Sequence, residues 1–200
     1  MKKYFKITIL TLFLSSLLIA STLTPLASLS VGKHEILFNY KMTLSEVTKL
    51  FGDAEVHKKG DAAESLTWIC YEIESNEKTS VLILSSGELG GGTYITGFEL
   101  ARPGLLPELE LGCTPIKIAR STISTNNGIA LGMSRNQVME TLGSPTKENE
   151  NNIAYKIIEE RFGPFGSHGQ EMQYFIVSSL DIFFENGIVV RIRGFRADQS

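Results

Sequence analysis

Two cysteines, Cys70 and Cys113, are the most reactive side chains of the sequence, and a disulfide between them is the first chemistry that it suggests. Disulfides persist in exported proteins and are rare in the cytosol, so this pairing is expected of an exported chain. The alternative is two buried thiols, because a free cysteine packs as a small apolar side chain. A catalytic thiol would need a base beside it, and no local signature marks one.

Three histidines, His34, His57 and His168, are the next candidates for metal or acid–base chemistry. None of them is spaced from another as in a short metal-binding motif, so we expect no metal and no cofactor. Ser167 lies next to His168, yet a serine nucleophile also needs an orienting group and an oxyanion hole, and no nucleophile-elbow motif is present. A non-enzymatic protein is therefore expected, with an unidentified hydrolase as an alternative.

Arginines near the end of the chain form the most prominent polar pattern. Arg191 and Arg193 share one face of a predicted strand because side chains alternate along it, and Arg196 follows. The formal net charge is -3, so this stripe is a local positive feature that could bind an acidic protein or the phosphates of a membrane surface. The alternative is a solvated edge strand whose charges prevent aggregation. The net acidity excludes the strongly basic face that nucleic-acid binding requires.

Trp68, Tyr71 and Tyr94 are aromatic side chains of the kind that anchor protein–protein contacts. The alternative is that they pack against their neighbours within a sheet. With Arg191, Arg193 and Arg196, they are the residues that the sequence nominates for binding a partner. Their roles depend on which face of the fold each one occupies.

The amino-terminal segment has the features of an export signal. Lys2, Lys3 and Lys6 precede an apolar run over residues 7–20, which predicts a periplasmic or secreted protein. The best small-x-small cleavage pattern ends at Ser30, so residues 1–30 are predicted to be the signal. An uncleaved membrane anchor is the alternative, because an apolar run of about 20 residues can span a bilayer.

Two segments of the remaining chain resemble each other, residues 42–52 and residues 133–143, at an offset of 91 (133 minus 42). Each begins with a hydroxyl residue followed three positions later by Glu or Gln, which is a helix-capping box, and each ends at glycine. The capping residues are Thr43 with Glu46 and Ser134 with Gln137. Apolar residues at helical spacing follow, so short amphipathic helices are predicted over residues 44–51 and 135–142.

Runs of β-branched and aromatic residues predict strands after each helix, at residues 65–73, 79–84, 93–98, 174–177, 180–184 and 188–192. Asn186 and Gly187 predict a tight hairpin, because both tolerate a positive φ. The expected fold class is α+β, with two tandem repeats, each a helix and an antiparallel meander, and with the helices packed on one face. The predicted divisions are a first repeat (31–101), a packed connector (102–127) and a second repeat (128–200).

The second repeat resembles the SmpA/OmlA family of small bacterial envelope proteins. The residues that carry this resemblance are 128–146, Tyr155 and 183–192. The tandem arrangement is similar to the β-lactamase inhibitor protein, in which two helix-plus-four-strand units present a concave sheet. The first repeat departs from the motif, with Lys41 where the second has Gly132. The resemblance implies binding or scaffolding and supplies no catalytic residues, and the inhibitor's contact residues do not map by motif onto this chain.

The expected function is therefore that of an exported, non-enzymatic binding or scaffolding module of the bacterial cell envelope. Helices that cover one face of an antiparallel sheet commonly leave the other face to solvent. We expect that open face to contact an envelope or secreted protein, and binding of envelope lipid or cell wall through the arginine stripe is the alternative.

Overall fold

The computed structural model describes residues 23–38, 40–61, 65–74, 79–87, 91–107, 109–110, 112–118, 123–165 and 170–199, with the backbone alone at residues 165 and 170. Within these described residues there are two helices, α1 (Leu44–Phe51) and α2 (Arg135–Leu142). The strands are β1 (Ser28–Val31), β2 (His34–Leu37), β3 (His57–Lys59), β4 (Leu66–Glu74), β5 (Ser80–Ser86), β6 (Gly97–Ala101), β7 (Thr114–Lys117), β8 (Ile123–Thr125), β9 (Lys147–Glu148), β10 (Asn152–Phe165), β11 (Gln170–Glu185) and β12 (Ile188–Gln199).

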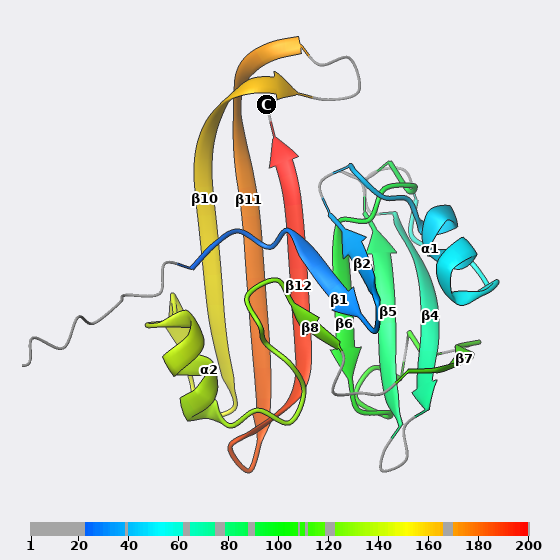
Figure 1. Ribbon diagram of the computed structural model, residues 1–200, viewed down its shortest axis with the longest axis vertical. Helices are drawn as coiled ribbons and strands as arrows, with labels where there is room; N and C mark the ends of the chain where they lie inside the picture. The colour runs from blue at the N-terminus through cyan, green and yellow to red at the C-terminus, as the bar shows by residue number, and fades with distance from the viewer. Residues whose placement is uncertain are drawn as a thin grey trace, which may run out of the picture.

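Most strands belong to one nine-stranded sheet, with the order β3-β4-β5-β6-β12-β11-β10-β9 and β7 added in parallel to β4. The other pairings in this sheet are antiparallel, so the fold is mostly antiparallel sheet with two helices, which is consistent with the predicted mixed α+β class. A small sheet, β2-β1-β8, lies with α1 and α2 over one face of the large sheet (Figure 1). The main apolar core fills the space between these layers.

Both helices begin as the capping pattern predicts. Thr43 Oγ1 accepts from the N–H of Glu46, and the Glu46 carboxylate accepts from the N–H of Thr43. Ser134 and Gln137 make the same reciprocal pair at α2. The cap at Thr43 lowers the pKa of Glu46, because the charged form of Glu46 accepts hydrogen bonds from Thr43. The two helices therefore start and end at the predicted residues.

The helix ends are also tied to the sheet in the same way. The Tyr71 hydroxyl on β4 donates to the carbonyl of Gly52, which follows α1, at 3.0 Å. The Tyr155 hydroxyl on β10 donates to the carbonyl of Gly143, which follows α2, also at 3.0 Å. Each bond satisfies a carbonyl that the end of a helix leaves without an intrahelical partner.

The two halves of the large sheet meet where β6 pairs with β12. In this antiparallel ladder Gly97 lies opposite Phe195, and Phe98 lies opposite Gly194. A side chain at Gly194 would overlap the ring of Phe98 and approach a methyl of Leu26. The ladder thus joins the halves through a close contact that only glycine at position 194 permits.

Residues 23–31 are an integral part of this fold. Leu26 and Leu29 are buried in the main core, with exposures of 2 % and 0 %. The N–H of Leu26 donates to Ser178 Oγ at 2.8 Å, and the Arg196 guanidinium donates to the carbonyl of Leu26 at 3.1 Å. The signal boundary predicted at residue 30 therefore falls inside β1.

Near the end of the chain, the predicted hairpin turn is correct, but the predicted strand boundaries are not. Asn186 and Gly187 have φ of 52° and 74°, so the predicted tight turn connects β11 to β12. The strands predicted separately at 174–177 and 180–184 form the single strand β11. The glycines and proline of residues 162–169 predict a turn-rich segment, and this prediction is wrong over residues 162–165, which continue β10. Within the described parts of the chain, no helix is long and apolar enough to cross a bilayer.

Candidate binding surface

The two faces of the large sheet differ in what covers them, and this difference locates the candidate surface. We call the face under α1, α2 and the small sheet the covered face, and the opposite one the open face. On the open face of β4 and β5, a second apolar cluster is buried beneath the connector. Its members are Trp68, Cys70, Val81, Ile83, Ala101 and Leu106, with Leu66, Leu109 and Cys113 packed against them.

The connector is fixed to this half of the sheet by covalent and backbone contacts. Cys70 and Cys113 form the predicted disulfide, with their Cα atoms 4.5 Å apart. After Cys113 the chain enters β7, which pairs in parallel with residues 71–74 of β4. The Glu110 carboxylate accepts from the N–H groups of Gly104 and Leu106 within the connector. The connector therefore covers the open face in the first half of the sheet.

The open face of β10 and β11 instead presents large apolar side chains to solvent. Ile158, Phe162 and Phe175 have exposures of 59 %, 78 % and 42 %. They share this face, because Glu160 lies opposite Phe175 and residues two apart on a strand point the same way. We call these three side chains the exposed patch. Exposed apolar groups that cluster in this way mark interaction sites.

The exposed patch reaches into the part of the β10–β11 hairpin that extends beyond the rest of the sheet. The last residue of β12 in the ladder, Gln199, pairs with Phe175. Phe162 pairs with Gln173, further along the hairpin, where β11 has no second neighbour among the described strands. Figure 1 shows the hairpin curving past the end of β12. A partner could therefore contact this part of the hairpin from more than one side.

The open face also carries a row of paired charges on β6, β11 and β12. Arg191 donates to Glu99 at 2.7 Å, and Arg193 donates to Asp181 at 2.8 Å. The guanidinium of Arg191 also lies over the ring of Phe183, 4.7 Å from its centroid. Arg191 and Arg193 share a face, as the strand period predicted, but neighbouring carboxylates neutralise the expected positive stripe.

Arg196 lies on the covered face instead. It bonds to the carbonyl of Leu26 and lies 3.4 Å from a carboxylate oxygen of Asp198, whose side chain is buried. The structure therefore separates Arg196 from Arg191 and Arg193. Its contacts hold the amino-terminal residues against β12.

The three nominated aromatic residues do not form one surface. Trp68 is on the open face but is buried beneath the connector, where the ring of His57 stacks on it at 5.4 Å. Tyr71 is on the covered face with no exposure, and burial together with Asp53 raises its pKa to about 12. Tyr94 precedes β6 and is 36 % exposed, with its ring against Tyr40. Only Tyr94 is available to a partner.

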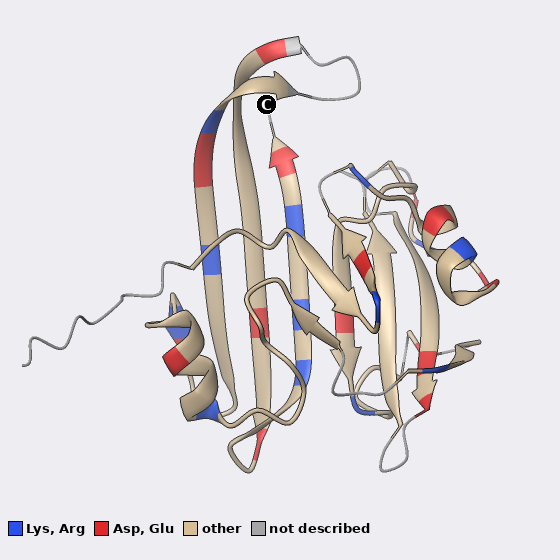
Figure 2. Ribbon diagram, in the orientation of Figure 1, with Lys and Arg blue, Asp and Glu red and all other residues tan. Residues whose placement is uncertain are grey.

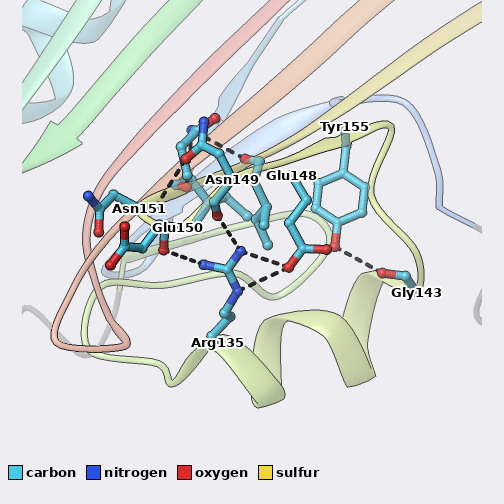
Figure 3. Close-up of polar contacts among 10 residues, drawn as sticks. Arg135, Gly143, Glu148, Asn149, Glu150, Asn151 and Tyr155 are labelled. Carbon is cyan, nitrogen blue, oxygen red and sulfur yellow. Dashed lines mark hydrogen bonds and ion pairs between the residues drawn. The ribbon is translucent and has the colours of Figure 1, made fainter.

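A polar cluster surrounds Arg135 at the start of α2 (Figure 3). Its guanidinium donates to Glu148 at 2.7 Å and to the carbonyls of Asn149 and Glu150. It also lies 4.9 Å from the centre of the Phe184 ring. Burial and Glu148 raise the pKa of the adjacent Tyr155, and Arg135 opposes this shift. These contacts fix α2 to the turn before β10, which is a structural role.

Other candidates for chemistry are dispersed. Ser167 and His168 lie outside the described residues. His34 and His57 belong to different sheets, and the described residues contain no cluster of three or more ligands suited to a metal. A groove of about 640 Å³ lies between the β1–β2 turn, the end of α1 and β7, and it shares no residue with the exposed patch.

The sequence reasoning missed the exposed patch. The alternation of Ile158, Glu160 and Phe162 was the available signal, because it is the period of a strand with apolar residues on one face. Gly163 and Pro164 obscured it by suggesting a turn.

Comparison with known protein families, characterised proteins and solved structures finds no match to this chain.

Proposed function

We propose that this chain is an exported, non-enzymatic binding module of the bacterial envelope that presents the open face of β10 and β11 to a protein partner. The observation that carries this proposal is the exposed patch, in which three large apolar side chains share one solvent-facing surface. Aromatic anchors of this kind carry most of the affinity in protein interfaces. The disulfide supports export, because such bonds persist in oxidising compartments.

A tandem duplication is the architecture that we propose for this module. Matched backbone contacts support it: Leu44 N–H donates to Thr93 and Ile95 N–H to Met42 in the first half. In the second half, Arg135 N–H donates to Gly187 and Val189 N–H to Met133. The matched helix caps and tyrosine contacts support it further, as does the resemblance to the SmpA/OmlA family.

The two proposed units then have different tasks. In the first, the connector covers the open face and supplies a rigid support. In the second, the same face is left to the partner. The paired state of Arg191 and Arg193 favours a protein partner over lipid phosphates, because their charges are already matched by Glu99 and Asp181.

Site-specific photo-crosslinking in the native compartment tests the proposal. A crosslinker at Phe162 should give one discrete protein adduct, and Phe175→Asp should remove it. A crosslinker at Val56, which is 60 % exposed on the loop after α1, is the matched control and should give none. Equal adducts at both positions would contradict the proposal. Binding of the native chain to anionic vesicles would also contradict it, if this binding is lost when Arg191 and Arg193 are changed to Gln.

A further inference from the structure

The groove between the β1–β2 turn, the end of α1 and β7 has the size of a small-molecule binding site. Its volume is about 640 Å³, and such sites usually have about 300–1,000 Å³. Its walls are mostly apolar, with Leu50 and Phe51 at the end of α1 and Ile116 and Ile118 along and just after β7. The β1–β2 turn lies directly beside this wall, since a Cβ at Gly32 would be 3.5 Å from a methyl carbon of Ile118. Three elements therefore offer apolar contacts to a ligand of this size.

His34 brings a polar ring to this apolar groove. In the small sheet His34 pairs with Val31, whose side chain is buried in the main core. Paired residues point to the same face of a sheet, so the His34 side chain also points inward. Its ring meets the Phe51 ring edge to face, with 5.3 Å between the centroids, and hydrogen-bonds to no other described residue. A protonated ring nitrogen of His34 is therefore available to donate to a ligand.

Lys33 places a positive charge next to His34. It is exposed in the β1–β2 turn and forms no ion pair with the described residues. The neighbouring carboxylate, Glu35, points to the outer face of the hairpin, where it accepts from Ser28 Oγ at 2.6 Å. No acidic residue is among the described residues that line the groove. This end of the groove is therefore suited to a negative charge.

A second basic residue also lines the groove, but its side chain is directed elsewhere. Figure 2 shows basic residues both at the β1–β2 turn and on β7, and the one on β7 is Lys117. Lys117 lies beside Glu74 in the parallel ladder with β4. Since Ile116 is part of the main core, strand alternation places the Lys117 side chain on the open face. Lys33 and His34 are therefore the groups that can hold an anion inside the groove.

We propose that this groove binds a fatty acid, with the alkyl chain along Leu50, Phe51 and Ile118 and the carboxylate bound by Lys33 and His34. The two carboxylate oxygens then accept from the Lys33 ammonium and from a ring N–H of His34, which are charge-assisted hydrogen bonds. An alkyl chain carries no further polar group, which matches the apolar walls. A peptide would bring backbone N–H and C=O groups along its whole length, and each of these needs a partner.

Titration of the protein with a series of alkyl carboxylates, followed by NMR of the backbone amides, tests this proposal. Decanoate should shift the amide signals of residues 31–34 and 50–51. Affinity should rise from hexanoate to octanoate to decanoate, by up to about fourfold for each CH₂ that is added, because each one leaves water for the apolar walls. Decanol has the same chain length without a charge and should bind about fivefold more weakly or worse. Decyl phosphate, which carries the anion of a phospholipid, should also bind more weakly, since two donor groups match two carboxylate oxygens.

A charge placed in the apolar part of the groove tests its location. Leu50 is 39 % exposed, and Leu50→Glu should weaken decanoate binding about tenfold or more, because the new carboxylate repels the ligand and is poorly solvated beside its chain. Leu105→Glu is the matched control, since Leu105 is 41 % exposed on the connector and does not line the groove. This second variant should bind decanoate as the native chain does.

The polar end is tested by Lys33→Gln combined with His34→Phe, which keeps a ring against Phe51. This double variant should bind decanoate about fivefold more weakly or worse and should bind decanol no more weakly than the native chain does, because only the carboxylate loses partners. Lys58→Gln removes a positive charge on β3, away from the groove, and should change neither affinity. The same NMR spectra report whether each variant is folded, and the double variant decides the outcome if Leu50→Glu unfolds.

A native chain that does not bind decanoate would overturn the proposal. Equal affinities of decanoate and decanol would overturn it as well, as would equal losses for Leu50→Glu and Leu105→Glu. Tighter binding of decyl phosphate would assign the groove to a lipid phosphate instead. The groove shares no residue with the exposed patch, so Phe175→Asp should remove the protein adduct and leave decanoate binding unchanged.

Discussion

At the residue scale, Gly194 is needed because its neighbours leave no room for a side chain, and not because of a positive φ. A Cβ there would overlap the Phe98 ring and lie 2.8 Å from Leu26 Cδ2. Gly194→Ala should therefore lower the free energy of unfolding by about 1–3 kcal/mol, the usual cost of overpacking a core. Chemical denaturation measures this change. Gly87→Ala is the matched control, because a Cβ there meets nothing within 4 Å, and equal losses for the two variants would contradict the contact.

Tyr71 makes stability depend on alkaline pH. Its pKa is raised from 10.0 to about 12 by burial, so between these values the unfolded chain loses a proton that the folded chain keeps. Tyr71 therefore contributes its full stability below pH 10 and loses it as pH rises toward 12. Urea midpoints of Tyr71→Phe and the native chain should differ most below pH 10 and converge above it. A constant difference across this window would refute the assignment.

Single residues also show where sequence reasoning succeeds and where it fails. Thr43 and Asn186 act through groups a few positions away, so their cap and turn were predictable from local chemistry. Trp68 and Tyr71 were nominated together for binding a partner, yet three positions separate them, and the strand period places them on opposite faces. That period was available in the sequence. The burial of Trp68 was not, because the connector that covers it lies far along the chain.

At the element scale, the disulfide and the connector act as one cover over the first half of the sheet. Replacing Cys70 and Cys113 together with Ser should cost about 2–4 kcal/mol, because the bond closes a loop of 43 residues in the unfolded chain. Trp68 is the single tryptophan and packs beneath the connector in the same cluster. Its fluorescence maximum should therefore lie further to the red in this double variant than in the native chain. Unchanged emission and an unchanged midpoint would show that the connector packs without the bond.

The β10–β11 hairpin shows why element lengths were harder to predict than element types. β11 was predicted in two parts, at residues 174–177 and 180–184, but no strand was predicted at β10, whose last part passes through Gly163 and Pro164, residues that ordinarily interrupt strands. These residues are tolerated because the outer edge of β10 has no described neighbour there that would need their hydrogen bonds. The exposed patch was missed together with β10, since that strand carries Ile158 and Phe162.

At the scale of the whole molecule, residues 23–30 hold the layers together. A chain that begins at Val31 should be less stable than one that begins at Leu23, because it lacks Leu26 and Leu29, and full burial of such a side chain is worth about 1.5–3 kcal/mol. Denaturation midpoints of the two chains measure this difference. Equal midpoints would mean that the signal boundary predicted at residue 30 leaves the fold intact.

The β6–β12 ladder also sets the order in which the molecule can be completed. Phe98 and Gly194 are 96 positions apart (194 minus 98), and β12 is the last described element of the chain. A chain that is made or translocated amino end first therefore carries β6 with one bare edge until β12 follows. Such distant pairing slows folding, because a long loop must close before its contacts form. During that interval the protein is at its most vulnerable to aggregation and to chaperone capture.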